Sequence, residues 1–434
     1  MRRIKPSEEE RRQLERISSE ILRRVEEIAA AKGVACRGIL VGSAARNTWL
    51  SGDRDIDVFI AVPEDGDLGA ALEIAREIAP EHEERYAEHA YVHAQIDGFD
   101  VDLVPCYDVR DPSRIKSAVD RTPFHSRYIS ERIRGLEDDV LLLKQFMKGV
   151  GVYGSDLRTG GFSGYLAELL VIYYGSFLRV LEGASSWRPG TRIDLAQGAD
   201  LRAPLVVIDP VDPNRNVAAA LTLDRMFQFV GAARCFLNSP NISFFFPPEA
   251  HAMHPDEIRA EIERRGTEFV LLEISAPDMV DDVLYPQMRK AEAAVRGLLE
   301  REGFQVLRSD VDLVRGEDVR ARLLFELSIW ELPSVRRHTG PPVWEAEHAS
   351  RFVRSNPSPL SGPYIDNGRL VVEIPRRYRR AVDLLSGEIQ RISLGRHLSY
   401  GSRRVLSTRE IIEMMDRDLA GFLTAYLNKK TRVC

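Results

Sequence analysis

Residues 39–62 read ILVGSAARNTWLSGDRDIDVFIAV, and this stretch decides how the N-terminal part of the chain folds. Its apolar start is typical of a strand that delivers Gly42-Ser43 to a polar turn, where a helix begins. A second strand then carries Asp55 and Asp57. Because side chains alternate between the two faces of a strand, both carboxylates point the same way, and the apolar residues between and after them take the buried face.

Two carboxylates side by side on an exposed strand face repel each other, and a divalent cation between them makes the arrangement favourable. An isolated Asp-x-Asp is usually a pair of solvated turn residues, but a second acidic strand favours a metal site here. FDVDLVPC, residues 99–106, places Asp100 and Asp102 on one strand face. We expect one of these two to be the third ligand of a site in which two Mg²⁺ ions, about 4 Å apart, support phosphoryl transfer.

The Gly42-Ser43 turn also fits a nucleoside triphosphate. Glycine lets the backbone approach phosphate oxygens closely, and amide and hydroxyl donors at the start of a helix bind such oxygens. Arg46 follows one turn into that helix, within reach of the same phosphates. The sequence therefore predicts a triphosphate next to the acidic strands.

Residues 149–154 read GVGVYG and match the Gly-x-Gly-x-x-Gly pattern of dinucleotide-binding sites. That fingerprint must follow a strand and open a helix. Residues 136–148 have helical periodicity instead, so these glycines are predicted to end a helix. We expect no dinucleotide site here.

The whole sequence predicts an α+β protein with three domains. An N-terminal helix, followed by short apolar runs that alternate with helical stretches, predicts a catalytic head with a mixed sheet over residues 1–136. A helical central domain is expected over residues 137–252. A βαββ-like pattern with terminal helices predicts an α/β body and tail over residues 253–434, with Asn367-Gly368 in a hairpin turn.

Basic residues are concentrated near the C-terminus. The chain has a net charge of −6, yet residues 331–434 contain 18 Lys and Arg against 11 Asp and Glu, which gives this segment +7. A solvated surface would also explain such a charge bias. We interpret the segment as a surface for nucleic-acid phosphates, with residues 376–380 (RRYRR) and Arg403-Arg404 as candidate contacts.

Composition favours a protein of the cytoplasm. Of the 434 residues, 44% are hydrophobic and 29% charged, which fits a soluble globular protein. The charged, amphipathic start lacks the apolar core of a secretory signal, and no apolar run is long enough to span a bilayer. The four cysteines form no Cys-x-x-Cys pair, so we expect all of them to be reduced.

Residues 42–59, GSAARNTWLSGDRDIDVF, resemble the signature of DNA polymerase β-type nucleotidyltransferases. The form of the signature is similar to that of the class I (archaeal-type) CCA-adding enzymes. Further segments that resemble this family follow in its order, namely FDVDLVPCYDV (99–109), IKSAVDRTPFH (115–125), LLKQFMKGVGVYGS (142–155), GGFSGYLAELLVIYYGSF (160–177), IDPVDPNRNVAAALTLD (208–224) and VDDVLYPQ (280–287).

The resemblance implies a role for individual residues. It implies catalytic metal ligands at Asp55, Asp57 and Asp102, so that Asp102 rather than Asp100 is the third ligand; family members often have Glu at the first position. It implies contacts to ATP or CTP by Ser43, Arg46, His125, Lys144 and Tyr153, with Thr122 close by and Arg215 at the base edge.

Four residues in these segments also have simpler interpretations. His125 could be a core histidine, Lys144 could extend to solvent from an amphipathic helix, and Tyr153 could be a packing aromatic. Ser163 is most simply a helix N-cap. Only the resemblance raises the first three residues above these defaults.

The resemblance further implies Mg²⁺-dependent attack of a tRNA 3′-hydroxyl on the α-phosphate of CTP or ATP, so that CCA is added without a nucleic-acid template. The implied partners are the tRNA acceptor end, ATP and CTP, so that the central domain would bind nucleotide and tRNA and the C-terminal domain would bind tRNA. No membrane partner is expected, and the sequence leaves open whether the chain forms a homodimer. A poly(A) polymerase or oligoadenylate synthetase relative would share the catalytic head and use another acceptor. An inactive RNA-binding module would be marked by loss of a carboxylate, and all three are present.

Overall fold

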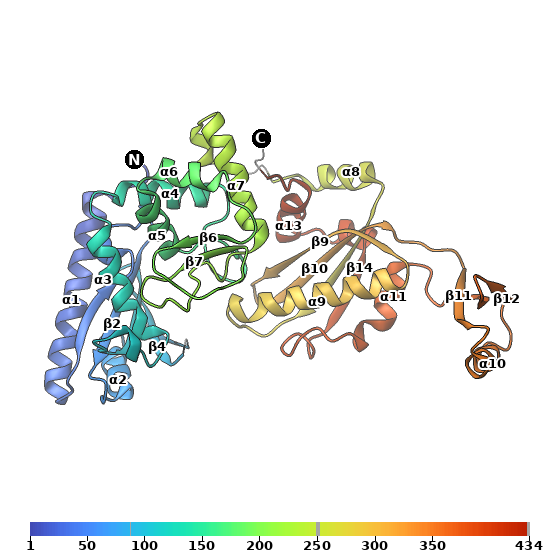
Figure 1. The fold of residues 1–434 in the computed structure, drawn as a ribbon, viewed down its shortest axis with the longest axis horizontal. Coiled ribbons are helices and arrows are strands. Elements are labelled where there is room, and N and C mark those ends of the chain that lie inside the picture. Colours follow the sequence, from blue (N-terminus) through green and yellow to red (C-terminus); the bar gives the residue numbers. More distant parts are fainter. Residues whose placement is uncertain (87, 249–251, 432–434) are drawn as a thin grey trace. The chain divides into compact units, whose positions relative to one another are not determined.

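The computed structural model describes residues 1–86, 88–248 and 252–431. The chain forms two compact units, Met1–Glu249 with Thr431–Cys434, and Ala250–Lys430. In Figure 1 the blue to green ribbon belongs to the first unit and the yellow to red ribbon to the second. The predicted boundary near residue 136 lies inside the first unit and stays a prediction.

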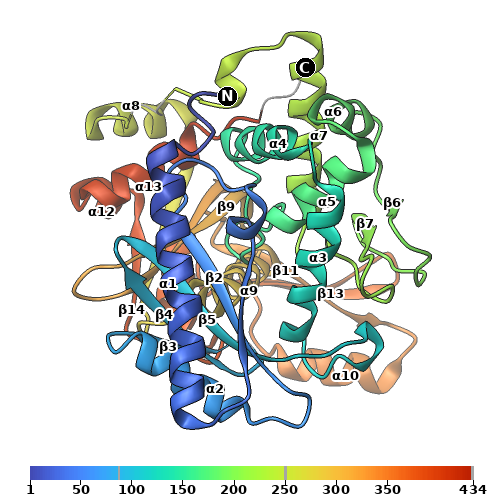
Figure 2. The ribbon, with the colours of Figure 1, turned by 90° about the vertical axis from the view of Figure 1, so that its left-hand side faces the viewer.

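The first unit begins with the predicted mixed sheet. Its strand order is β1-β2-β5-β4-β3; β2 and β5 are parallel, and the other neighbours are antiparallel. The helices α1 and α2 cover one face, on which α1 runs across the strands (Figure 2). The bounds are β1 Arg37–Val41, β2 Asp55–Val62, β3 Glu83–Tyr86, β4 Ala90–Ile96, β5 Phe99–Tyr107, α1 Glu8–Lys32 and α2 Leu68–Ile78.

Local signals explain the ends of α1. Ser7 and Glu10 form a reciprocal capping box at its start, and Gly33 ends it with a positive φ of 65°. Its apolar stripe packs on alternate residues of β2, among them Ile56 and Val58, which are fully buried. The N-terminal helix and the buried face of β2 are therefore confirmed.

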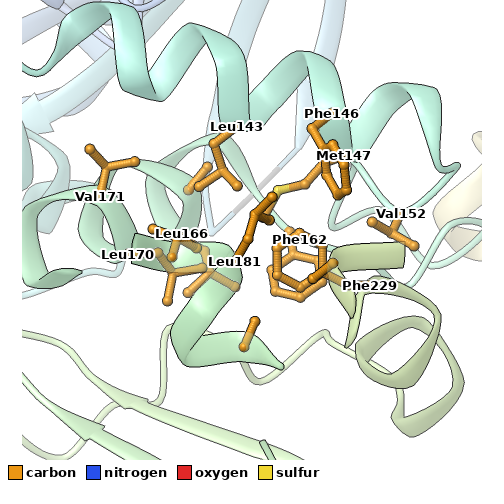
Figure 3. Packing of buried hydrophobic residues seen from close by; sticks show 14 of the residues in the cluster. Leu143, Phe146, Met147, Val152, Phe162, Leu166, Leu170, Val171, Leu181 and Phe229 are labelled. Atoms are coloured by element: carbon orange, nitrogen blue, oxygen red, sulfur yellow. The ribbon is translucent and has the colours of Figure 1, made fainter. Parts of the chain in front are cut away.

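Helices form most of the rest of the first unit, around an aromatic-rich core. Phe162 and Phe229 lie 4.9 Å apart between ring centroids, and Phe146 packs beside them (Figure 3). The elements are α3 Thr122–Arg132, α4 Glu137–Gly149, α5 Gly164–Tyr174, α6 Phe177–Ala184, α7 Leu223–Asn238 and the parallel pair β6 Thr191–Asp194 and β7 Leu205–Ile208. The pair β6–β7 was not predicted, because β6 (TRID) is mostly polar and the four-residue apolar run of β7 (LVVI) shows no distinguishing periodicity.

The glycines at residues 149–154 end a helix, as predicted. Gly149 is the last residue of α4, and a side chain there would meet the carbonyl oxygen of Phe244 at 2.1 Å. Gly151 and Gly154 have positive φ angles of 74° and 123°. The segment turns the chain into the next part of the core and opens no helix at these glycines.

The second unit has a sheet of order β14-β8-β10-β9 between two helical layers. Helices α9 and α11 pack on one face, and α8, α12 and α13 on the other. The βαββ order and the terminal helices are as predicted. The bounds are α8 Pro255–Arg265, β8 Glu268–Ser275, α9 Asp281–Arg301, β9 Gln305–Val314, β10 Arg320–Ile329, α11 Ala381–Glu388, β14 Arg403–Ser407, α12 Thr408–Glu413 and α13 Arg417–Leu427.

A small three-stranded sheet, β11-β13-β12, belongs to the same unit. Asn367 and Gly368 join two of its strands with φ angles of 49° and 76°, as the predicted hairpin turn requires. The elements are β11 Val335–Pro342, α10 Ala346–Ser355, β12 Ser361–Asp366 and β13 Arg369–Pro375.

Two further findings concern apolar helices and cysteines. No single described helix is long and apolar enough to cross a bilayer, although α5 and α6, bent by 92°, pass that test as a pair on length and composition. Cys36 and Cys106 are free thiols, but Cys235 is disulfide-bonded, so the prediction that all cysteines are reduced is wrong for this residue. The same prediction for Cys434 lies outside the described residues.

Candidate active site

The predicted acids lie on one face of two neighbouring parallel strands. In the register of β2 with β5, Asp55 lies opposite Asp100 and Asp57 lies opposite Asp102. Ile56 lies between Asp55 and Asp57 in the sequence and is fully buried on the other face of the sheet. The alternation predicted from the sequence thus brings four carboxylates together.

These carboxylates influence one another electrostatically. Burial, and then the charges of Asp102 and Asp55, raise the pKa of Asp57 to about 6, although Arg46 opposes the shift. Burial and the neighbouring charges of Asp53, Asp100 and Asp102 also raise the pKa of Asp55. Stored repulsion of this kind favours a bound cation.

The carboxylate oxygens are the ligand type that a hard divalent cation prefers. The described residues, however, contain no group of three or more His, Cys, Asp or Glu arranged closely enough to hold a metal ion. The side chain of Asp102 is held by His93, whose Nδ1 lies 2.7 Å from its Oδ1. Carboxylate oxygens are therefore suitable ligands for a metal ion. The side chains of Asp55, Asp57 and Asp102 must change conformation to enclose it.

Gly42 places the phosphate turn directly against Asp57. Its φ is +71°, and a Cβ atom at this position would lie 2.2 Å from Oδ2 of Asp57. The register of β1 with β2 pairs Val41 with Asp57, which brings the next residue to the carboxylate. Both the backbone angle and the missing side chain make glycine necessary here.

A cavity of about 590 Å³ opens beside this turn. It is lined by all five residues predicted to contact the nucleotide, which are Ser43, Arg46, His125, Lys144 and Tyr153. Thr122, Ser163 and Arg215 line it as well. Residues from the head, from α3, α4 and α5, and from the loop after β7 thus meet around one space large enough for a nucleotide.

The end of the cavity nearest the turn is organised by Glu168, a buried carboxylate of α5. It accepts hydrogen bonds from Arg46, at 2.9 Å from Nη2 and 3.2 Å from Nε, and from the hydroxyl of Thr48. Arg46 also donates to Ser126 Oγ at 3.2 Å. Arg46 thus lines the cavity while its guanidinium is bound to protein groups, and its contact with phosphate stays a prediction.

Lys144 belongs to the same end. It is only 2% exposed, and its Nζ donates to the carbonyl oxygen of Thr48 at 2.7 Å, with Glu168 at 3.9 Å. Burial lowers the pKa of Lys144, and the charge of Glu168 opposes this effect. The alternative that Lys144 extends into solvent is therefore wrong.

Tyr153 and Gly164 pack closely in the cavity wall. A Cβ atom at Gly164 would lie 3.0 Å from the hydroxyl of Tyr153 and 3.5 Å from Nζ of Lys144. Ser163 caps α5 by accepting from the amide of Leu166, as predicted. The start of α5 therefore fits around two of the predicted nucleotide contacts.

A second buried carboxylate, Asp209, follows β7, is fully buried and binds other side chains of the cavity wall. Its Oδ2 lies 2.9 Å from Nε2 of His125 and accepts from Nη1 of Arg215 at 2.7 Å. His125 stacks on Tyr165, with ring centroids 4.4 Å apart. His125 is therefore a hydrogen-bonded member of the cavity wall, a geometry that fits both a nucleotide contact and a satisfied core histidine, and its contact with nucleotide stays a prediction.

Comparison with known proteins assigns the chain to a family. It is 44% identical to the CCA-adding enzyme of Methanoregula boonei over 441 aligned positions, which cover 99% of this chain and 94% of the relative. The chain belongs to the CCA-adding enzyme family. The CCA-adding enzymes of Methanosarcina mazei (44% identical, covering 98% and 97%) and Methanothermobacter thermautotrophicus (43% identical, covering 99% and 97%) are similar over comparable lengths.

Three family models match this CCA-adding enzyme family member in chain order. They describe a nucleotidyltransferase domain at residues 20–125, a tRNA nucleotidyltransferase second domain at 138–246 and a CCA-adding enzyme C-terminal domain at 265–408. The chain is therefore a tRNA nucleotidyltransferase, and the polymerase β-type fold of its head is confirmed. The poly(A) polymerase and oligoadenylate synthetase alternative is not favoured.

Two functional candidates of this CCA-adding enzyme family member were not predicted from the sequence, namely the buried carboxylates Glu168 and Asp209, which bind residues that line the cavity. Glu168 is the single charged residue in the otherwise apolar helix GYLAELLVIYY. A charge on a helix that is apolar all round is rarely buried without a partner, so this signal was visible in the sequence. Asp209 carried a weaker signal, since an acid directly after a buried strand is common at surface turns.

Proposed function

We propose that the chain adds C, C and A to the 3′ end of tRNA from CTP and ATP, using Mg²⁺ held by Asp55, Asp57 and Asp102. One observation supports this proposal above the others. The cavity that collects all five predicted nucleotide contacts has Gly42-Ser43 at its edge, where the turn packs directly on Asp57. A triphosphate in this cavity would lie beside the acidic face of β2 and β5.

Different residues of the chain would contribute to the reaction in different ways, according to their place in the site. Bound Mg²⁺ would neutralise charge on the phosphates and favour ionisation of the attacking 3′-hydroxyl. The backbone amide and hydroxyl of Ser43 would hold triphosphate oxygens, and Lys144 would supply positive charge close to them. His93 keeps Asp102 in place through its 2.7 Å contact. Base selection would fall to Arg215, with His125 beside it on the carboxylate of Asp209.

Tests of this reaction use tRNA that lacks its terminal CCA. Labelled CTP alone should add two C residues and stop, and A should be added only when both C residues are present. Unlimited addition of A would contradict the proposal and favour a poly(A) polymerase activity. Absence of incorporation from every nucleoside triphosphate would contradict it as well.

We propose that the basic C-terminal segment contacts tRNA phosphates. Of the candidate arginines, Arg376 donates to the carbonyl oxygen of Glu302, and Arg403 to that of Ser399. Their guanidinium groups therefore stabilise the fold. Arg377, Arg379, Arg380 and Arg404 are exposed, unlike Arg376 and Arg403, and are the better candidates for phosphate contacts. Two of them have carboxylate partners that a phosphate would displace, Arg377 pairing with Glu388 and Arg379 with Glu331.

We also propose a cytoplasmic location and a homodimer. The overall composition supports the location, which cell fractionation would test by recovery in the soluble fraction. Sedimentation equilibrium would test the dimer, for which a mass near 49.1 kDa would contradict the proposal.

A further inference from the structure

Asp209 connects two side chains that come from distant parts of the sequence. His125 lies on α3 and Arg215 lies in the loop after β7, yet both meet the same oxygen, Oδ2, at 2.9 and 2.7 Å. The other oxygen, Oδ1, accepts from the amide of Val211 at 2.9 Å and from the hydroxyl of Tyr165 at 3.4 Å. These four contacts of the Asp209 carboxylate are therefore made with the cavity wall and with the loop that carries Arg215.

Backbone hydrogen bonds within the loop that carries Arg215 hold its two ends together. The amide of Asp209 donates to the carbonyl oxygen of Arg215 at 3.1 Å, and the amide of Arg215 donates to the carbonyl oxygen of Asp212 at 2.9 Å. Asp212 also pairs with Arg121, just before α3, at 3.1 Å. The ion pair between Arg121 and Asp212 and the hydrogen bond between His125 and Asp209 thus fix this loop to the segment that carries His125.

The environment of Asp209 keeps it charged. Burial alone would raise its pKa, but the hydrogen bond and charge of His125, with the Val211 amide and Arg215, hold the pKa of Asp209 at about 2. A buried carboxylate with this many donors is rigid, because any movement leaves a buried charge unpaired. The same contacts hold the side chains of His125 and Arg215 in place.

We propose that Asp209 is the positioning residue for base selection, which holds Arg215 and His125 at fixed places on the base end of the cavity. The inference rests on the proposed function, because it requires a nucleotide in this cavity with its triphosphate at Gly42-Ser43. Arg215 is partly exposed and lines the cavity, so the rest of its guanidinium is available to a base edge. A displaced guanidinium would pair less selectively with the edge of the base.

The test compares Asp209→Asn with Asp120→Asn as a matched control. Asp120 is also a buried carboxylate of the first unit; it accepts from the amides of Tyr107 and Ser117, both at 2.9 Å, and does not line the cavity. The readout is kcat/KM for CTP divided by kcat/KM for UTP on tRNA lacking CCA. Thermal unfolding of both variants reports the purely structural loss.

Asp209→Asn should lower this selectivity ratio by about 10- to 100-fold, whereas Asp120→Asn should leave it unchanged at a comparable loss of Tm. A ratio within about twofold of wild type in Asp209→Asn, or an equal change in Asp120→Asn, would overturn the proposal. A wild-type protein that adds no nucleotide would instead refute the proposed function.

A crystal structure of the wild-type protein with CTP tests the proposal even if Asp209→Asn does not fold. Arg215 and His125 should remain on Oδ2 of Asp209, with the cytosine beside them. An Arg215 that leaves Asp209 when CTP binds, or a cytosine at the opposite end of the cavity, would overturn the inference.

Discussion

Individual carboxylates in this cavity region have opposite environments, and these environments indicate their roles. Asp57 is surrounded by like charges, which together with burial raise its pKa to about 6. Asp209 is surrounded by donors, which hold its pKa at about 2. A bound cation would relieve the repulsion around Asp57, whereas the hydrogen bonds of Asp209 are already satisfied by groups of the chain itself.

Substitution of the metal-binding acids should abolish nucleotide addition. Asp57→Ala and Asp102→Ala should each lower kcat by more than about 100-fold, because loss of even an outer-shell partner of a metal costs about 10- to 100-fold. tRNA affinity, measured by filter binding, should remain close to that of wild type. Near-normal turnover in either variant would refute the metal assignment.

The neighbouring Asp100 provides the matched control for Asp102, since both lie on the same face of β5. Asp100→Asn should lower kcat by less than about tenfold, because we assign no ligand role to this residue. If Asp100→Asn proves as damaging as Asp102→Asn, the assignment of the third ligand is wrong.

The raised pKa of Asp57 predicts a pH-dependent requirement for metal. Protons compete with cations for this carboxylate once the pH falls below about 6. The Mg²⁺ concentration that gives half-maximal activity should therefore change little between pH 8 and pH 7. Below pH 6 it should rise by up to about tenfold for each pH unit. A half-maximal concentration that stays constant down to pH 5 would contradict this expectation.

At the scale of elements, the turn between β1 and β2 is what joins the acidic strands to the cavity. The register of the two strands brings Gly42 to Asp57, and the turn then continues to Ser43 in the cavity wall. The chemistry of the site therefore depends on the conformation of one short turn.

Gly42→Ala should inactivate the enzyme, since the added methyl group would lie 2.2 Å from Oδ2 of Asp57. Gly33→Ala is its control, because Gly33 has a similar φ of +65° and nothing within 4 Å of an added Cβ. Gly33→Ala should cost about 1–2 kcal/mol in the free energy of unfolding and keep its activity. Full activity in Gly42→Ala would show that the turn does not control the carboxylate.

Much of this arrangement could be predicted from the sequence, because it follows from local patterns. Strand alternation placed Asp55 and Asp57 on one face, and helical periodicity identified the glycines at residues 149–154 as a helix end. The pairing of Arg46 with Glu168 and of His125 with Asp209 could not be predicted. The partners in these pairs are separated by 122 and 84 residues, and only tertiary packing brings them together.

At the scale of the whole molecule, charge is divided along the sequence rather than balanced. Residues 331–434 carry +7 in a chain whose net charge is −6. An acidic protein can therefore bind RNA through one basic segment, and its affinity should depend strongly on salt.

The double variant Arg379→Gln, Arg380→Gln should weaken tRNA binding and reduce the slope of log affinity against log salt by about 1 to 2, because each lost phosphate contact lowers the slope by nearly one. Arg264→Gln, an exposed arginine on α8 outside the basic segment, is the control and should leave the slope unchanged. Equal slopes for the double variant and wild type would show that these arginines do not contact phosphate.

The most direct measurement is a crystal structure with CTP and Mn²⁺, whose anomalous scattering locates the cation that replaces Mg²⁺. We predict metal bound by oxygens of Asp55, Asp57 and Asp102, at about 2.0–2.3 Å, with the triphosphate along Gly42-Ser43 and the cytosine in the cavity beside Arg215. Metal bound away from these three carboxylates, or CTP bound outside the cavity, would contradict it.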